Sequence, residues 1–172
     1  MNQPSSFPRP PHEPFLPILR ELALCFQAFE RYSSRHIRSL GLTPSQFDII
    51  ATLGNTPGMS CKELGERTLI TKGTLTGVID RLEARGFLRR RGAKHDRRSF
   101  TVALTAAGER EFERVFPAHL SFLRPAFGGF STEELMELEQ NLHRLRGRIE
   151  DAETKNAAPA SGSNDAGGKG GR

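Results

Sequence analysis

The sequence predicts a mainly α-helical protein with a small β-hairpin, arranged as a winged helix-turn-helix between N- and C-terminal helices. Apolar residues recur at intervals of three and four along most of the chain, and capping patterns begin several of these segments. An alternating segment that is typical of a β-strand follows a cluster of basic residues. With 172 residues, of which 36% are hydrophobic, the chain is long enough for one domain of ordinary size.

The two ends differ from the middle in composition. Residues 1–14 contain five prolines, and residues 152–172 form a Gly/Ala-rich tail without any aromatic residue, Leu, Ile, Val or Met. Neither segment can bury enough apolar surface to offset the entropy cost of ordering it. We therefore expect two disordered ends and a folded region over residues 15–151.

Helix signals follow one another through the first half of this region. An amphipathic helix is expected over about 15–40, and Gly41 ends it. A capping box of Thr43 and Gln46, with Pro44 at the first helical position, begins the next helix. Ser60 with Glu63 and then Thr71 begin two further helices, the second of which ends at Gly86. The last two are the expected helix-turn-helix, within a winged helix-turn-helix at about 43–105.

The stretch RRRGAKHDRRS at residues 89–99 contains six Arg or Lys residues and one carboxylate, Asp96. Such a run is either a solvated loop or a surface that binds an anionic partner. It lies between FLRRR and SFTVALT, in which Phe100, Val102 and Leu104 alternate as in a half-buried strand. A hairpin with a basic tip behind a helix-turn-helix favours the second interpretation.

Two further helices are expected over about 105–150. Thr105 caps the first, which Pro117 should kink, and Ser131 with Glu134 forms a capping box at the start of the second. The last helix carries a heptad-like seam, which is too short for an autonomous coiled coil and should pack on other helices or on a second copy of the chain. The seam consists of Leu135, Leu138, Leu142, Leu145 and Ile149.

Composition and motifs exclude several classes of function. The formal net charge of +5 is compatible with nucleic acid or an anionic membrane as partner. No apolar run is long enough to span a membrane and none resembles a signal peptide, so we expect a cytoplasmic protein that does not bind membranes. The sequence has no nucleophile elbow, no glycine-rich phosphate loop and no zinc-binding spacing among its five histidines. We therefore expect no enzyme, no cofactor and no metal site.

Taken together and in order, these motifs resemble the MarR family of transcription regulators from Leu19 to Ile149. The resemblance rests on LITKGTLTGVIDRLEARGFLRRR, on the wing pattern of Asp96 and Arg98 followed by Leu104 and Thr105, and on TAAGE. It implies a homodimer, most simply a repressor, in which the first and the last two helices interlock. Leu22 and Phe26 join the seam as dimerisation residues. It also implies a pseudo-palindromic operator with half-sites near 10 base pairs apart, and DNA binding that a small-molecule effector modulates.

Candidate DNA contacts follow from the helix-turn-helix and from the resemblance. The second helix of such a motif enters the major groove with its N-terminal half. Arg98 matches the wing arginine that probes the minor groove, and Asp96 matches the carboxylate that positions it. Phosphate contacts are expected from Lys94, Arg97 and either Arg90 or Arg91, and from Ser60 and Lys62 at the preceding helix. The expected reading residues are Lys72, Thr74, Thr76 and Arg81, together with Thr71, whose other interpretation is a helix cap.

Other interpretations remain open from the residues alone. The basic wing can bind an acidic protein instead of DNA, which would make the chain a protein-interaction module. Cys25, on the apolar side of the first helix, is interpreted as a buried structural thiol, with a cysteine-based redox sensor as the alternative. Cys61 is interpreted as a neutral residue near a helix start. His36 and His119 are the candidate contacts for a small phenolic or anionic effector.

Overall fold

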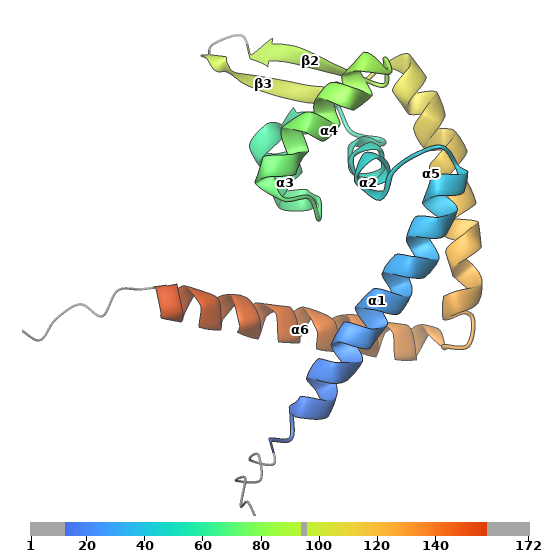
Figure 1. Cartoon of the computed structure of the whole chain (residues 1–172), viewed down its shortest axis with the longest axis vertical. Coiled ribbons are helices and arrows are strands. Elements are labelled where there is room, and N and C mark those ends of the chain that lie inside the picture. Colours follow the sequence, from blue (N-terminus) through green and yellow to red (C-terminus); the bar gives the residue numbers. More distant parts are fainter. Residues whose placement is uncertain (1–12, 94–95, 158–172) are drawn as a thin grey trace, which may run out of the picture. The chain divides into compact units, whose positions relative to one another are not determined.

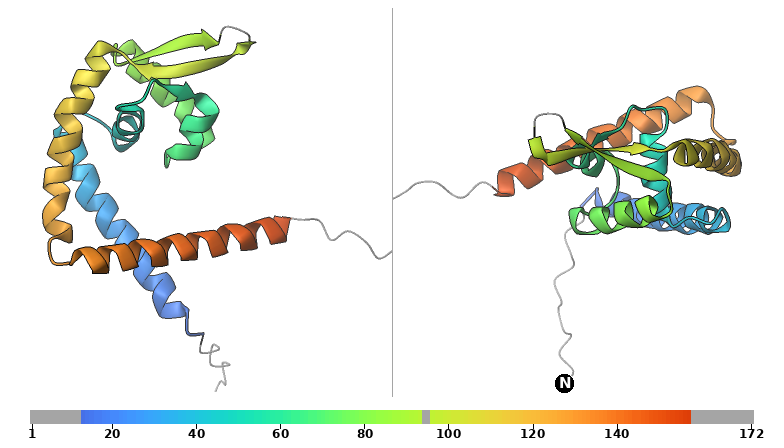
Figure 2. Two further views of the ribbon diagram at one scale, coloured as in Figure 1. Left: turned by 180° about the vertical axis from the view of Figure 1, so that it is seen from behind. Right: turned by 90° about the horizontal axis from the view of Figure 1, so that it is seen from above.

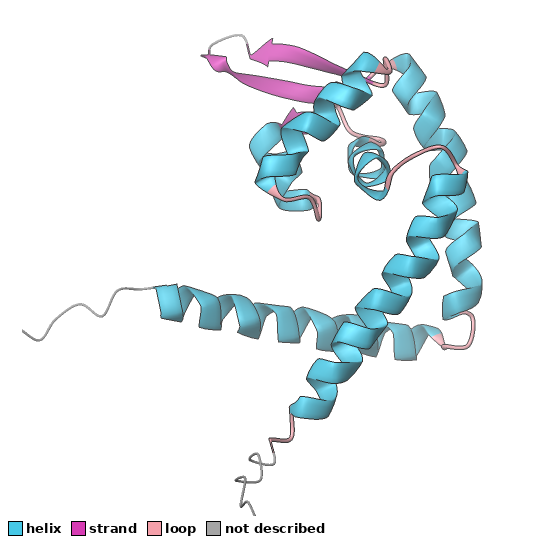
Figure 3. Cartoon of the chain, in the orientation of Figure 1, coloured by secondary structure: helices cyan, strands magenta, loops and turns pink. Residues whose placement is uncertain are grey.

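The computed structural model describes residues 13–93 and 96–157. The chain divides into two compact parts, one that ends at Pro125 and one that begins at Ala126. Helices dominate both parts (Figure 1, Figure 3). Within the described ranges no helix combines the length and apolar character that crossing a membrane requires.

The order of elements follows the prediction for a winged helix-turn-helix, with one additional short strand. The elements of the chain are α1 (Leu16–Ser39), α2 (Pro44–Leu53), β1 (Met59–Ser60), α3 (Cys61–Arg67), α4 (Lys72–Ala84), β2 (Leu88–Ala93), β3 (Asp96–Leu104), α5 (Ala106–Phe127) and α6 (Thr132–Ala157). The predicted fold class is therefore confirmed.

The described strands form an antiparallel sheet in the order β1-β3-β2. Residues Leu88 to Gly92 of β2 pair with Leu104 to Phe100 of β3, and Met59 pairs with Val102. The strand β1 can approach β3 because Gly58 precedes it with φ +99°, and a Cβ there would lie 2.6 Å from the carbonyl oxygen of Val102. The β2–β3 ribbon projects beyond the helices of this part as the wing (Figure 2).

One hydrophobic core holds the helix-turn-helix to the sheet. Its fully buried side chains come from α2, α3, α4, β3 and α5. They are Ile49, Ile50, Leu53, Leu64, Val78, Ile79, Leu82, Val102 and Val115. Burying a side chain of this size contributes about 1.5–3 kcal/mol, so this core fixes the orientation of α4 relative to the wing.

Most predicted helix starts are present. Thr43 and Gln46 form the complete capping box, and Ser131 and Glu134 bond to each other's backbone N–H groups in the same reciprocal way. At α3 only half of the expected box forms. The Ser60 hydroxyl accepts from the Glu63 N–H at 3.1 Å, but the Glu63 carboxylate pairs with Arg67 at 2.9 Å.

The helix α5 contains Pro117, where a kink is expected, and also Pro125, and it runs through both without interruption. One boundary differs from the prediction. The helix α6 continues to Ala157, past the expected limit at residue 151. The residues from Ala152 to Ala157 lack large apolar side chains, but they also lack Gly and Pro, so nothing in them breaks a helix. Residues 1–12 and 158–172, where most of the two predicted disordered ends fall, lie outside the described residues.

Candidate nucleic-acid interface

The helix α4 has one buried and one exposed face. Leu75, Val78, Ile79 and Leu82 are buried in the core. The described side chains of Thr74, Thr76 and Arg81 are exposed on the other face, where Gly73 adds no side chain. Small hydroxyl side chains and one guanidinium allow this face to come close to base edges and to form hydrogen bonds with them.

The start of α4 differs from the expected cap. Thr71 occupies the N-cap position, but its hydroxyl makes no hydrogen bond to the helix backbone. It lies instead 3.0 Å from the hydroxyl of Thr74. The first N–H groups of α4 are therefore not capped by Thr71 and point out of the helix end, where they can bind an anion. The backbone of Lys72 begins α4, and its side chain lies outside the described part.

The predicted phosphate contacts at α3 lie on the surface. Lys62 and Ser60 are both exposed, and Ser60 caps α3 with its side chain. Because its hydroxyl accepts from the Glu63 N–H, its own proton remains available for an acceptor outside the chain.

The wing contains an irregularity at its tip. Gly92 pairs with Phe100, whereas Ala93 pairs with Asp96, so Arg97 and Arg98 lie in the stretch of β3 that the register skips. The structure describes their backbone and that of Asp96 as strand, and their side chains lie outside the described part, as does the whole of Lys94. The predicted roles of these four residues stay predictions.

Arg90, one of the two alternatives for a phosphate contact, is paired within the chain. Its guanidinium pairs with Asp80 and, at 2.6 Å, with Glu83, both on α4, and lies over the ring of Phe100. The hydrogen bond that Arg90 donates to Asp80 raises the pKa of Arg90 above its usual value. Two carboxylates thus neutralise this charge, and Arg90 joins the wing to α4. Arg91, the other candidate, is exposed.

The two candidate effector residues come together between α1 and α5. The Nδ1 atoms of His36 and His119 are 3.0 Å apart, and the Nε2 atom of His119 lies 3.1 Å from the hydroxyl of Ser33. The ring of His36 stacks on Phe122, which also stacks on Tyr32. Burial, with a smaller contribution from His36, lowers the pKa of His119. Among the described side chains no group of three or more suits a metal ion.

The environment of Cys25 differs from the expectation, whereas that of Cys61 agrees with it. Cys25 is exposed rather than buried, because the apolar face of α1 on which it lies has no cover within the described chain. Burial raises the pKa of the Cys61 thiol, which favours the neutral thiol and works against a reactive thiolate.

The apolar seams of α1 and α6 are not buried within the chain. Leu22 and Phe26 are exposed on α1, and no residue of α6 is buried. In the part that begins at Ala126, Leu135, Leu138 and Leu142 line an open hollow of about 460 Å³ together with Phe127. Two helices that each leave an apolar face in solvent are typical of an interface that another copy or partner covers.

Sequence reasoning missed some of the residues that fix this surface. The carboxylate of Asp48 on α2 accepts from the N–H of Leu69 at 2.9 Å and so holds the turn before α4. Leu69 itself is 93% exposed, although the leucine and isoleucine at 69 and 70 look alike in the sequence. Arg85 and Arg114 bind the turn between α1 and α2. No periodicity indicates such contacts, because each joins residues far apart in the chain.

A helix-turn-helix with an exposed second helix, a core that fixes it and a basic β-ribbon beside it define a winged helix-turn-helix, an architecture typical of DNA-binding proteins. The model of the MarR family matches residues 40–99. An uncharacterised HTH-type transcriptional regulator of Bacillus subtilis, YkoM, is 31% identical over 121 residues, which cover 70% of this chain and 79% of the relative. The chain belongs to the MarR family of transcription regulators.

Two further matches agree with this assignment. The HTH-type transcriptional regulator PecS of Dickeya dadantii is 33% identical over 80% of this chain and 82% of its own. The structure of Bordetella bronchiseptica BpsR, whose DNA binding is described as regulated by 6-hydroxynicotinic acid, matches with a TM-score of 0.70. Its identity is 26% over 79% of this chain and 97% of that one.

Proposed function

We propose that the protein is a cytoplasmic homodimeric repressor that binds a pseudo-palindromic DNA operator. The observation that carries this proposal is the exposed face of α4, with Thr74, Thr76 and Arg81 beside the basic wing. The exposed apolar seams of α1 and α6 support a second copy of the chain as the partner that buries them. We call the winged helix-turn-helix at about 43–105 the lobe. Two copies of the lobe suit half-sites about one helical turn apart, near 10 base pairs.

We assign the contacts by element. The exposed face of α4, from Thr71 at its N-cap to Arg81 in its last turn, reads the major groove, while Ser60 and Lys62 bind phosphate at the start of α3. Arg98 enters the minor groove, where the negative potential attracts a guanidinium, and Asp96 orients it. Lys94, Arg97 and Arg91 neutralise backbone phosphates, which makes the affinity fall with rising salt.

Fluorescence anisotropy with purified protein tests this proposal. The duplex upstream of the protein's own coding region is compared with a scrambled duplex of equal length across a salt series. We expect binding that is tight, salt-sensitive and selective for the upstream duplex. Equally weak binding to both at physiological salt would favour a basic wing that contacts an acidic protein.

We further propose that a small phenolic or anionic effector binds beside His36 and His119. The aromatic rings of Tyr32 and Phe122 and the two imidazoles offer stacking surfaces and hydrogen-bond donors in one place. In BpsR, which has the same fold, 6-hydroxynicotinic acid, an aromatic carboxylic acid, regulates DNA binding. An effector acts only through a different affinity for the DNA-binding and the non-binding state of the dimer.

A panel of hydroxylated aromatic acids added to the protein–operator complex tests the effector site. We expect at least one compound to release DNA from the wild type and to lose potency on His36→Ala. Release that is equally potent on His36→Ala and His119→Ala would place the effector elsewhere.

A further inference from the structure

The turn between α1 and α2 places two consecutive carbonyl groups where helices from other parts of the fold can bind them. Leu40 is the C-cap of α1, and Gly41 follows with φ +85°, a conformation that favours glycine. Leu42, directly after the turn, is buried in the core. The last carbonyl groups of a helix lack intrahelical donors and carry partial negative charge, so they attract basic side chains.

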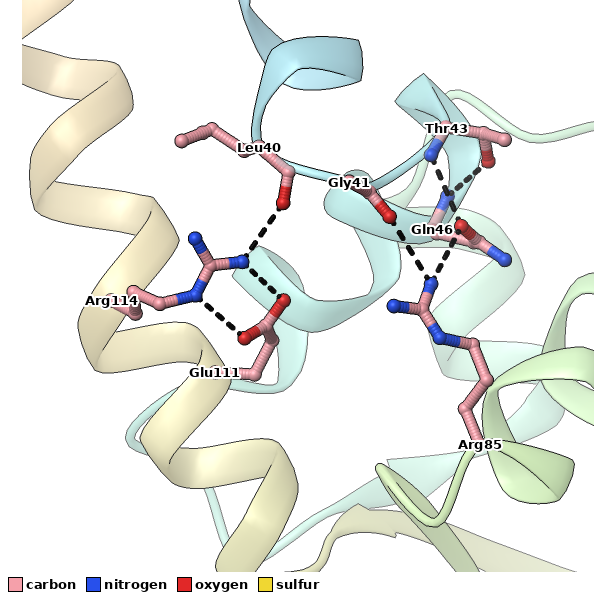
Figure 4. A network of polar contacts seen from close by, with 7 residues as sticks. All are labelled: Leu40, Gly41, Thr43, Gln46, Arg85, Glu111 and Arg114. Carbon is pink, nitrogen blue, oxygen red and sulfur yellow. Dashed lines mark hydrogen bonds and ion pairs between the residues drawn. The ribbon is translucent and has the colours of Figure 1, made fainter.

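Arg114 of α5 binds the first of these carbonyls (Figure 4). Its Nη2 atom donates to the Leu40 oxygen at 2.8 Å. Glu111, one turn earlier on α5, accepts two bonds from the same guanidinium at 2.9 and 2.7 Å. These bonds raise the pKa of Arg114 and lower that of Glu111, whose side chain is only 12% exposed. A carboxylate that is nearly buried therefore fixes the direction of the guanidinium.

Arg85 binds the second carbonyl from the opposite side of the turn. It is the C-cap of α4, and its Nη1 atom donates to the Gly41 oxygen at 3.4 Å and to the Gln46 Oε1 atom at 3.3 Å. The same amide oxygen accepts from the N–H of Thr43, which keeps it in place (Figure 4). The guanidinium also lies over the ring of Phe87, 4.8 Å from its centroid. These bonds are longer than that of Arg114, so the Arg114 side is the stronger half.

We infer that Arg85, which joins α4 to this turn, and Arg114, which joins the turn to α5, are positioning residues. Together they restrict the direction of the reading helix α4 relative to α1 and α5, and hence the half-site spacing that the dimer accepts. We call the two arginines and the Leu40–Gly41 turn the clasp. The inference rests on the proposed homodimer, in which α1 and α5 belong to the helices that join the two copies. A small rotation of the lobe about this turn changes the distance between the two reading helices.

The clasp is suited to positioning more than to stability. Arg114 is half exposed, so solvent screens its ion pair with the more buried Glu111 and limits what the pair contributes to the free energy of unfolding. The core between α2 and α4 stays intact without it, since Ile49, Ile50 and Ile79 are fully buried. Removing the clasp should therefore leave a folded lobe whose angle is less restricted.

Operators of different spacing test the inference directly. Affinities are measured for duplexes in which the two half-sites are moved apart or together by one or two base pairs, and for a duplex with a single half-site. The wild type should prefer one spacing sharply, because each base pair turns a half-site by about 35° around the duplex. Arg114→Ala should reduce the ratio between the best and the shifted spacings by about two- to thirtyfold. Its affinity for the single half-site should stay unchanged.

Three variants make the test specific. Arg110→Ala removes the same charge from an exposed position of α5 and should keep the wild-type ratio. Arg114→Lys can still donate to Leu40 but cannot form both bonds with Glu111, so its ratio should lie between those of Arg114→Ala and the wild type. Glu111→Gln leaves the arginine charge in place and loosens its direction, and should also lower the ratio. It provides a second route if Arg114→Ala does not fold.

A uniform loss of affinity at every spacing and at the single half-site would overturn the inference, since it would indicate a phosphate contact or a damaged lobe. Unchanged ratios in Arg114→Ala and Glu111→Gln would overturn it as well. If the wild type bound DNA selectively but sedimented as a monomer, the proposed homodimer would fail, and the clasp would lose its role in spacing. Failure of the dimer is thus distinguished from failure of the clasp by sedimentation of the wild type.

Discussion

Arg90 and Arg91 are neighbours in one basic run, and they have different surroundings. Successive side chains of a strand point to opposite faces. Arg90 therefore turns toward Asp80 and Glu83 on α4, while Arg91 is exposed. The density of positive charge in a sequence thus overstates the charge that a partner meets, because one of these arginines is already neutralised within the fold.

Removing the side chain of Arg98 in the wing should weaken DNA binding without affecting the fold. For Arg98→Ala we expect operator affinity to fall roughly fivefold or more, since contacts of this kind contribute about 1–3 kcal/mol. Anisotropy titrations measure the affinity, and Arg110→Ala serves as the charge-matched control. An operator affinity equal to that of the wild type would remove Arg98 from the interface.

Asp48 offers a test of the turn before α4. Burial raises its pKa, partly offset by the hydrogen bond from the Leu69 N–H. Folding therefore favours the protonated carboxyl, and the charged form costs stability as pH rises through the folded-state pKa. Asp48→Asn keeps an oxygen acceptor without the charge, whereas Asp48→Ala loses a bond that contributes about 1 kcal/mol.

Thermal unfolding should accordingly separate the two Asp48 variants. At neutral pH we expect Asp48→Asn to melt at or above the wild-type temperature and Asp48→Ala to melt a few degrees lower, about 2–8 °C. The advantage of the asparagine should shrink as pH falls toward 3.8, the ordinary value for aspartic acid. An asparagine variant that melted as low as the alanine variant would contradict this account.

At the scale of elements, the packing of α1 against α5 includes the buried ring of His119, whose neutral form is favoured because burial lowers its pKa. The rings of His36 and His119 share a hydrogen bond, and the groups around them are Ser33 and Tyr32 on α1, Phe47 on α2 and Phe122 on α5. Of the charged forms nearby, only that of His36 contributes to the lowered pKa of His119. A second proton on the pair would bring two N–H groups face to face.

The contact between α1 and α5 should therefore weaken in mild acid. The folded-state pKa of His119 is lowered from its ordinary value of 6.5. The contribution of His119 to the free energy of unfolding is therefore complete above about pH 6.5 and is lost as pH falls through the folded-state pKa. We expect the wild-type melting temperature to fall between pH 7.5 and pH 5, and to fall less in His119→Gln. Circular dichroism melts at matched ionic strength measure both, and parallel pH profiles would refute the prediction.

Local patterns predicted the elements well. The helix starts at Thr43 and Ser131 and the alternation of Phe100, Val102 and Leu104 depend on neighbours in the chain, and the structure has them. Tertiary contacts were not predicted, because they join residues that are far apart in the chain. Arg114 reaches Leu40 across 74 positions of the sequence, and the bond from Leu69 to Asp48 spans 21. Neither contact leaves a periodic trace.

At the scale of the whole molecule, the exposed seam of α6 predicts self-association. Leu142→Asp would place an unpaired carboxylate in an apolar interface, so we expect the dimer to weaken by roughly thirtyfold or more. Sedimentation velocity over a concentration series measures this. Gln140→Glu adds the same charge outside the seam and should leave association unchanged. A Leu142→Asp protein that remained dimeric at low concentration would place the interface elsewhere.

Whether the Cys25 thiol is buried could not be predicted from the sequence of one chain. Its helical face is apolar, which indicates burial, yet the described chain leaves the thiol exposed together with Leu22 and Phe26. Periodicity shows that a face will be covered but not which molecule covers it. The same reasoning applies to the seam of α6, where the pattern was correct and the partner is a proposal.

The two prolines inside α5 give this helix particular mechanical properties. Pro117 and Pro125 have no backbone N–H, so the carbonyl groups of Glu113 and Ser121 lack their usual intrahelical donors. Bending stiffness is lowest where such bonds are missing. Bending of α5 should therefore be concentrated near the two prolines instead of being spread along the helix. The segment between the two prolines carries His119 and Phe122. A bend at either proline would therefore move these two side chains, while the hydrogen bonds of the other turns stay intact.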